Sequence, residues 1–503
     1  MHRFTARRQC TILVLCLAPL VVSPRSAAQD GTSAVPAVPG LPADPVAGKT
    51  YPLRVDGSNR GVLLTVHSAA RVGRYGTRTA LDGRALLVLD TEWENTIPFT
   101  FVREQKTVQP TMYKIPDLAD HLYLLLDGQR VARISEVAET LIGHVPLKDF
   151  ALDRIGSRLR GNVVFEVPAA GPVGAAELRF YDFAHGHIVV PLYLDGAKPT
   201  ELKPVAALLK NEVVEAGVFG FAKQPALDGQ TAPEGMTFVV ADLRARSLFT
   251  FDGDASAFNP KATPGSKMRV GTVADWTEAH RFLQLVVDGE RAYSPILPGT
   301  TLPDAPRFLP DVYTGGRVVF LAPSDAKSLE VRCDFPNAKP PGGGGYLRPK
   351  GITLTLEGKR PALPQHKPIA SVDDDVFKVA VVAQAVAQRF GGVAAPEGRK
   401  FLVLDVVVNN VGKQGELFQT SEQLKYAPQD DSAPVDVDTA TFNGKYRPAP
   451  LVFIPPGERR TFQVAFAVAA AEARPRLAYG GVSAAKVLDL QPLDAPGAAP
   501  ASP

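Results

Sequence analysis

One short pattern occurs three times along this chain. It spans Gly83–Asp90, Gly235–Asp242 and Gly398–Asp405, and reads glycine, two spacers, two apolar residues, valine, a small or apolar residue, and aspartate. The three glycines lie 152 and 163 residues apart, which is the spacing of domains and not of solenoid repeats. The sequence therefore predicts three versions of one β-rich unit, and it defines this organisation much better than an activity.

Length and composition agree with three domains. The chain has 503 residues, enough for about three domains of ordinary size. With 43 glycines and 45 prolines it favours many turns and few long helices. Breaks rich in proline and glycine near 194–204 and 358–368 give predicted domains over 56–197, 198–360 and 361–492.

Strand patterning predicts an all-β chain of three tandem Ig-like antiparallel β-sandwiches. Short β-branched or aromatic runs alternate with Gly, Pro, Asn and Asp turns, as in sandwich folds. In each repeated strand the alternating residues beginning at Leu87, Val239 and Leu402 form the more apolar face, which should be the core. Asp90, Asp242 and Asp405 fall on the opposite face, where we expect them to cap a turn or pair with a cation. Leu118–Leu126 is ambiguous between helix and strand, and its length favours strand.

The N-terminus has the pattern of a secretory signal peptide over residues 1–28. Arg3, Arg7 and Arg8 precede an apolar run, and Ser26-Ala27-Ala28 forms a small-residue cleavage site. The apolar run is about 13 residues, too short to span a bilayer comfortably. Residues 29–55 are predicted to form a Pro/Ala-rich linker, and 493–503 a similar tail. We therefore expect an exported protein, periplasmic or extracellular, with no integral membrane span in the mature chain.

Removal of the leader changes the charge balance. The full chain has 55 Lys and Arg against 52 Asp and Glu, a net charge of +3. The leader carries four arginines and no acids, so the mature chain has 51 − 52 = −1. Without a basic cluster interleaved with aromatic residues, the sequence gives no support for nucleic-acid binding.

Cys333 is the one cysteine left after cleavage, because Cys10 and Cys16 belong to the leader. An intrachain disulfide is then excluded, and the cores must supply the stability. Cys333 lies in a strand-like run without a neighbouring activating group. This pattern predicts a buried structural thiol and not a nucleophile.

The third copy carries features that resemble a family of bacterial exported Ig-like domains, the immunoprotective extracellular protein-like family. They are the strand Gly398–Asn410 ending in Asp-Val-x-Val-x-Asn-Asn, a Pro-Gly-Glu turn before the apolar strand Pro456–Val468, and a closing Leu-x-Tyr at Leu477–Tyr479. The first two copies keep part of this pattern. The resemblance implies a surface or periplasmic accessory role and transfers no catalytic residue.

Two histidines are the first candidates for a metal site. His185 and His187 are two residues apart, so on a strand both imidazoles would face the same side and could share a metal ion. The other two copies have no equivalent pair. The alternative is that these residues form a solvated hairpin tip.

Acidic loops are the second candidates. Asp252 and Asp254 alternate like the oxygen ligands of calcium loops, but the later EF-hand positions hold Ala257 and Thr263 in place of Gly and Glu. Further aspartates occur at 373–375, 430, 431, 436 and 438, and calcium could stiffen a junction between tandem sandwiches there. Most such acidic runs are solvated loops.

Catalytic motifs are weak. Gly48-Lys49-Thr50 ends like a phosphate-binding loop but lacks its first glycine. Ser324 with Lys327 and Ser483 with Lys486 have a serine–lysine spacing without the partner motifs of that enzyme class. The sequence thus predicts a non-catalytic binding, adhesion or envelope-scaffold protein without a cofactor, with an envelope protein or polysaccharide as partner. The alternative is a metal-dependent extracytoplasmic protein that uses His185, His187 or the acidic loops.

Overall fold

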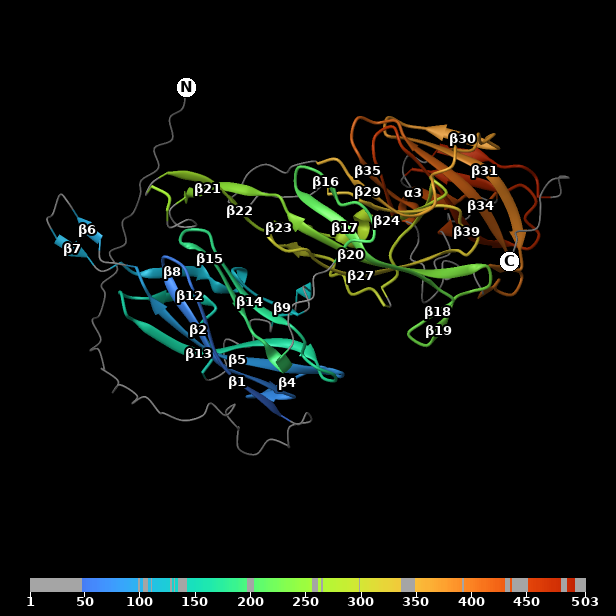
Figure 1. The fold of residues 1–503 in the computed structure, drawn as a ribbon. Helices are drawn as coiled ribbons and strands as arrows, with labels where there is room; N and C mark the ends of the chain where they lie inside the picture. Colours follow the sequence, from blue (N-terminus) through green and yellow to red (C-terminus); the bar gives the residue numbers. More distant parts are fainter. Residues whose placement is uncertain are drawn as a thin grey trace, which may run out of the picture.

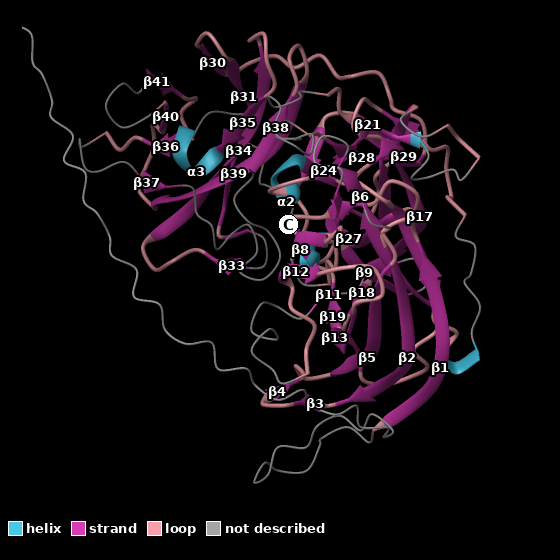
Figure 2. Cartoon of the chain, turned by 90° about the vertical axis from the view of Figure 1, so that its left-hand side faces the viewer, coloured by secondary structure: helices cyan, strands magenta, loops and turns pink. Residues whose placement is uncertain are grey.

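The computed structural model describes sixteen stretches of the chain, which the statements below concern (Figure 1). They are residues 48–97, 100–102, 107–109, 111–126, 129–130, 132–133, 143–196, 203–255, 261–263, 266–297, 299–335, 349–390, 393–429, 435–436, 451–480 and 486–493. These residues form a mostly β structure of several antiparallel sheets, which confirms the predicted class. Figure 2 shows strands and loops, with short helical turns between them. The predicted signal peptide over 1–28 lies outside the described residues.

Each copy of the repeated pattern forms a central strand of 12 residues. These strands are β5 (Arg84–Asn95), β20 (Met236–Ser247) and β34 (Arg399–Asn410). The glycine before each strand has φ of 72°, 73° and 73° respectively. Side chains rarely adopt this left-handed backbone conformation, so the turn explains why glycine recurs at this point of the pattern.

The same four-strand order surrounds each central strand. The sheets run β1-β2-β5-β13, β16-β17-β20-β27 and β30-β31-β34-β39, and β11 (Ala132–Arg133) adds a fifth strand to the first. The flanking strands are β1 (Lys49–Ser58), β2 (Val62–Val72), β13 (Arg158–Pro168), β16 (Leu209–Lys210), β17 (Val214–Gln224), β27 (Thr314–Pro323), β30 (Ala370–Asp373), β31 (Phe377–Ala387) and β39 (Arg459–Ala469). We call β1–β15, β16–β29 and β30–β41 the first, second and third repeats.

A second sheet also recurs in each repeat. Its order is β10-β9-β14-β15, then β25-β24-β28-β29, then β37-β36-β40-β41. The strands are β9 (Leu122–Leu126), β10 (Gln129–Arg130), β14 (Ala176–Asp182), β15 (Gly186–Pro191), β24 (Leu283–Val287), β25 (Arg291–Tyr293), β28 (Leu329–Cys333), β29 (Ile352–Glu357), β36 (Leu424–Tyr426), β37 (Val435–Asp436), β40 (Arg476–Tyr479) and β41 (Lys486–Asp489). Strand β9 confirms the strand interpretation for the second part of the ambiguous segment 118–126, whereas Leu118–Asp120 forms a helical turn.

Short two-stranded ribbons complete the repeats. One ribbon directly follows β2, β17 and β31 in the chain, and the other ribbons lie in the connections between the first and second sheets of a repeat. The ribbons are β3 (Arg74–Tyr75) with β4 (Arg78–Thr79), β18 (Ala226–Leu227) with β19 (Gln230–Thr231), β32 (Arg389–Phe390) with β33 (Val393–Ala394), β6 (Thr100–Val102) with β7 (Thr107–Gln109), β8 (Tyr113–Asp117) with β12 (Lys148–Leu152), β21 (Thr250–Asp254) with β22 (Lys267–Gly271), β23 (Ala274–Asp275) with β26 (Arg307–Phe308), and β35 (Glu416–Gln419) with β38 (Leu451–Ile454). The helical turns are η1 (Leu118–Asp120), η3 (Leu194–Gly196), α2 (Ala279–Phe282) and α3 (Thr420–Gln423).

Each repeat has a main hydrophobic core to which both of its sheets contribute. The predicted inward faces are confirmed, because Leu87, Leu89 and Trp93 lie in the first core and their counterparts in the other two. Those counterparts are Val239, Ala241, Leu243 and Ala245, and Leu402, Leu404, Val406 and Val408. Of the outward aspartates, Asp90 pairs across the strands with Arg160, and Asp242 pairs with Arg244 on its own strand.

A β-bulge occurs at the same place in every repeat. The second strand slips by one residue between Val66 and Ser68, between Val218 and Gly220, and between Val381 and Ala383. In each case the residue after the bulge pairs with the aspartate of the repeated pattern. The extra residue reverses the alternation of faces beyond it.

An Asx turn introduces the second strand of every repeat. The side-chain oxygens of Asn59, Asn211 and Asp374 each accept hydrogen bonds from the backbone N–H groups two and three residues later, at 2.6–2.9 Å. Such side chains satisfy backbone donors that the ladder leaves open. The repeated sequence pattern does not include this turn, because the residue is Asn in the first two repeats and Asp in the third.

Two details differ from the sequence-based expectations. The linker predicted over 29–55 ends earlier, because β1 begins at Lys49 and pairs with β2 from that residue on. Tyr181-Asp182-Phe183 matches Cys333-Asp334-Phe335 in the sequence, but strand pairing aligns Phe180, and not Tyr181, with Cys333. In the part of the chain that the structure describes, no helix is long and apolar enough to cross a membrane.

Candidate functional site

His185 belongs to a polar cluster around a buried carboxylate. Its Nδ1 lies 3.1 Å from Asp182 Oδ2, and the hydroxyl of Tyr113 donates to the same oxygen at 2.6 Å. Asn59 also donates to Asp182, at 3.2 Å. Burial opposes ionisation of Asp182, but the hydrogen bonds from His185 and Tyr113 outweigh it and hold the pKa of this carboxyl below its ordinary value.

His187 is directed toward the second repeat. Its ring lies 5.0 Å from the ring of Tyr181 and 5.4 Å from that of Phe183, measured between centroids. The Nε2 atom lies 3.4 Å from the carbonyl oxygen of Gly271. Burial lowers the pKa of His187 below its ordinary value. The two rings therefore lie against different atoms, that of His185 against the carboxylate of Asp182 and that of His187 against the carbonyl oxygen of Gly271.

The acidic candidates are dispersed. Asp252 lies on β21, is mostly exposed, and has Arg269 at 3.8 Å, while Asp254 pairs through its backbone with Lys267. Asp374 forms the Asx turn already described, and Asp436 pairs with Lys425. The candidates at 430, 431 and 438 lie outside the described residues. Within the described part of the chain, no three His, Cys, Asp or Glu side chains are grouped as metal ligands would be.

The other residues singled out in the sequence make contacts that hold the fold together. Cys333 is fully buried, and burial raises the pKa of its thiol, so the thiolate that a nucleophile needs is disfavoured. The hydroxyl of Ser324 donates to the carbonyl of Gly235, and Lys49 pairs with Asp195. Ser483 lies outside the described residues, and Lys486, its partner in the serine–lysine spacing, is the first residue of β41.

The first and second repeats meet through two crossed ion pairs, which we call joint 1 (Asp120, Arg179, Tyr181, Arg307 and Asp311). Arg179 of the first repeat donates to Asp311 at 2.7 Å, and Tyr181 donates to Asp311 at 2.6 Å. Arg307 of the second repeat donates to Asp120 at 2.8 Å. Beside these pairs lies a small apolar cluster of Tyr123, Leu125, Tyr181 and Leu309, with Phe183, Val273 and Val312 at its margin.

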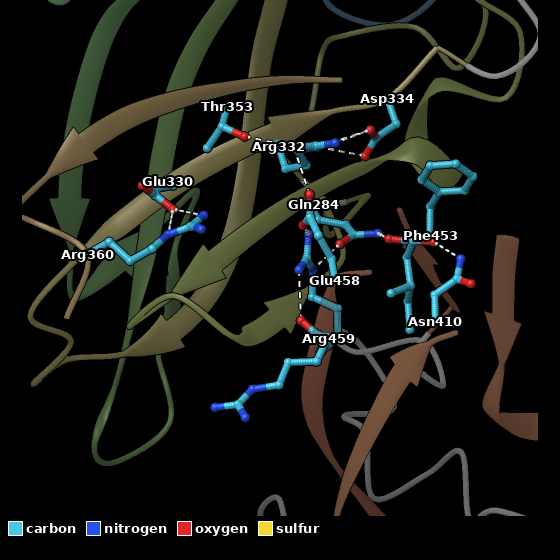
Figure 3. A network of polar contacts seen from close by, with 12 residues as sticks. Gln284, Glu330, Arg332, Asp334, Thr353, Arg360, Asn410, Phe453, Glu458 and Arg459 are labelled. Carbon is cyan, nitrogen blue, oxygen red and sulfur yellow. Dashed lines mark hydrogen bonds and ion pairs between the residues drawn. The ribbon is translucent and has the colours of Figure 1, made fainter. Parts of the chain in front are cut away.

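The second and third repeats meet through a buried polar network, which we call joint 2 (Gln284, Arg332, Asp334, Glu458 and Arg460; Figure 3). Arg332 donates to Asp334 at 2.8 Å and lies 3.5 Å from Glu458 across the joint. Arg460 donates to Glu458 at 2.8 Å and to Gln284 at 3.4 Å. Gln284, Asp334 and Arg460 are only 0%, 3% and 2% exposed. Burial raises the pKa of Asp334, although Arg332 and Arg460 oppose this shift.

Backbone and core also continue across joint 2. Residue Arg291 of β25 pairs in parallel with Thr461 of β39, and this pairing merges the strands of two repeats into one eight-stranded sheet. The amide of Gln284 donates to the carbonyl of Phe453 at 2.9 Å. Phe453 itself belongs to the core of the second repeat, and Ala292 to the core of the third.

Sequence reasoning missed both joints. Gln284 and Arg332 alternate with apolar residues on their strands, which indicates an outward face of a sheet. That reading is right for the strand, but in the folded chain the third repeat covers this face. A signal was present in the pairing of Arg332 with Asp334 two residues later, although the same pattern is common at exposed surfaces.

The seven charged residues that are buried in the described part of the chain all have partners of opposite charge or a histidine. The pairs are Asp90–Arg160, Asp182–His185, Arg244–Asp242, Glu290–Arg459, Glu330–Arg360, Asp334–Arg332 and Arg460–Glu458. Catalytic groups are commonly buried with a charge imbalance that shifts their pKa for reaction. Here the buried charges are paired within sheets for Asp90 and Arg244, at a turn for Asp182, and at or beside joint 2 for the other four.

Comparison with protein-family models, with curated proteins and with solved structures finds no match to this chain.

Proposed function

We propose that the chain is an exported, non-catalytic binding or envelope-scaffold protein, built from three tandem Ig-like β-sandwich modules that correspond to the three repeats. The observation that carries this proposal is the pairing of all seven buried charged residues within the described part of the chain. Two of these residues are paired within a sheet, one is paired at a turn, and four are paired at or beside the junction of the second and third repeats. Tandem modules connected in this way provide reach and several contact surfaces. The leader-like residues 1–28 support export.

The contact surfaces in this proposal are the turns at the ends of the sheets, since loops on a rigid scaffold commonly bind partners. The partner class is an envelope protein or a polysaccharide. Resemblance of the third copy to exported Ig-like domains supports the same class. The three turns that precede β5, β20 and β34 are exposed and equivalent, so one kind of ligand could meet the chain at three points.

A metal-dependent role is the second candidate, and one observation favours it. His185 has its Nδ1 beside the buried carboxylate of Asp182, and the side chain of His185 is 31% exposed. Metal-ligating histidines often use their second nitrogen in this way, because the carboxylate orients the ring. A metal bound here would need further ligands from a partner or from residues outside the described stretches.

The experiment is a pull-down of the mature chain, residues 29–503, from its own envelope extract, with elemental metal analysis of the same preparation. A specific protein or glycan partner and no stoichiometric metal is the result expected for a binding scaffold. Stoichiometric metal that disappears in a His185→Ala, His187→Ala double variant would replace this proposal with the metal-dependent one. Replacement of Asp228 by Asn is the matched control, because Asp228 is 59% exposed, pairs with Arg317 and is not among the metal candidates.

A further inference from the structure

The two joints are held by different kinds of contact. Joint 2 has backbone pairing between β25 and β39, shared core residues, and a polar network in which Gln284, Asp334 and Arg460 are buried while Glu458 is 35% exposed. The segment between the second and third repeats is also fixed there, because Arg360 pairs with Glu330 and His366 Nε2 lies 2.8 Å from Glu290 Oε1. Rotation of the third repeat would have to break these contacts together.

Joint 1 depends on contacts that water reaches. Its acceptors Asp311 and Asp120 have side chains that are 46% and 55% exposed. No sheet is continuous across this joint in the described residues. The apolar cluster of Tyr123, Leu125, Tyr181 and Leu309 is separate from the main core of either repeat. In Figure 1 the second repeat lies between the other two, with the first repeat on one side of it and the third on the other.

Salt acts differently on these two kinds of contact. Exposed ion pairs contribute little individually and are screened as ionic strength rises, whereas buried pairs are screened much less. The arginines of joint 1 are each held by an acid of their own repeat, Arg179 by Glu177 and Arg307 by Asp275. Screening therefore releases the bonds across the joint while leaving each arginine with a partner.

From this contrast we propose that the chain bends at joint 1 and is rigid at joint 2, so that ionic strength controls the orientation of the first repeat. The second and third repeats then move as one rigid unit, and the orientation of the first repeat relative to this unit changes with salt concentration at joint 1. The proposal extends the proposed scaffold function and rests on its modular organisation. It predicts that the undocked fraction at joint 1 rises about tenfold between low and high salt, the combined effect of two screened surface pairs.

The test is pulsed electron resonance of the mature chain, residues 29–503, carrying nitroxide labels. Asp82→Cys, Glu234→Cys and Glu397→Cys place labels on exposed turns that are equivalent in the three repeats. The distance between the labels at positions 82 and 234 reports on joint 1, and the distance between those at positions 234 and 397 reports on joint 2. Cys333 remains in place because it is fully buried. Distances are compared at about 0.05 and about 1 M NaCl, between which the Debye length falls from roughly 14 Å to about 3 Å.

We expect a distance distribution across joint 1 that broadens and shifts at high salt, and one across joint 2 that stays narrow. Asp120→Asn with Asp311→Asn should reproduce the high-salt distribution at low salt, while the control Asp252→Asn should not. A joint 1 distribution that ignores both salt and these substitutions would overturn the proposal, and so would broadening at joint 2. The distances are read without any partner, so a failed pull-down and a failed hinge are separate results.

Discussion

Removing Arg332 is the sharpest test of joint 2. In Arg332→Met the side chain keeps similar length but no longer donates to Asp334, which is 3% exposed. Two unit charges about 4 Å apart attract by about 4 kcal/mol at an effective dielectric constant of 20. Breaking a buried pair typically costs about 3–5 kcal/mol, because one charge is left in a poorly solvated site. Arg460 still lies near Asp334, so we expect a loss of about 3 kcal/mol in the free energy of unfolding.

The assay is thermal unfolding of the mature chain by calorimetry. A loss of this size lowers the transition temperature by roughly 6–12 °C for a unit of about 150–250 residues. Arg269→Met is the matched control, because Arg269 is 74% exposed and lies 3.8 Å from Asp252, and it should change stability by under about 1 kcal/mol. Adding Asp334→Asn to Arg332→Met should recover part of the loss. Equal transitions for Arg332→Met and Arg269→Met would refute the assignment of buried charge to joint 2.

Three further outcomes are expected. Burial opposes ionisation of Asp374, but hydrogen bonds from the Phe377 amide and the Tyr479 hydroxyl outweigh it and lower the pKa of Asp374. The ionised carboxylate therefore stabilises the folded chain above about pH 4, and this contribution is lost as the pH falls through the lowered pKa. An acid titration of unfolding should therefore show a difference in the free energy of unfolding between wild type and Asp374→Asn at pH 7 that shrinks as the pH falls below about 4, and a constant difference would contradict this. Asn410→Ala should cost about 2 kcal/mol in denaturant unfolding, because Asn410 donates to the carbonyls of Gln414 and Ile454, whereas Asn409→Ala should cost less than half as much. Cys333 should react with a thiol reagent only after unfolding, and rapid modification of the native chain would show that its site is accessible.

Much of the fold could be predicted from alternation and turns. The inward faces beginning at Leu87, Val239 and Leu402 were assigned correctly, because apolar residues at every second position define one buried face of a sheet. The repeated glycine was also informative, since its position coincides with a left-handed turn before each central strand. Both features are determined by residues that are close together in the sequence, so a local sequence pattern is enough to predict them.

The candidate site was less predictable, because its contacts join residues far apart in the chain. Gln284 donates to the carbonyl of Phe453, 169 positions away. A polar residue on an alternating strand indicates an outward face, but not whether another repeat covers that face. His187 illustrates the same limit, because its nearest group across joint 1 is the carbonyl oxygen of Gly271, which no side-chain pattern reports.

The bulge in β2, β17 and β31 has a consequence for how these strands tolerate change. Val66, Val218 and Val381 face the cores before the bulge, and Ala69 and Phe221 face them after it, three residues on. Residues three apart on a regular strand face opposite sides of the sheet, so both can face the core only because the bulge adds one residue between them. Deleting His67 would remove the bulge and leave Ala69 facing the core, because Val66, Ser68 and Ala69 would then alternate regularly against the neighbouring strand. With His67 kept but the bulge flattened, strict alternation from Val66 would turn Ala69 outward. The same holds for Phe219 and Val382 in the other repeats, so the bulge keeps the later residues of each strand on their proper faces.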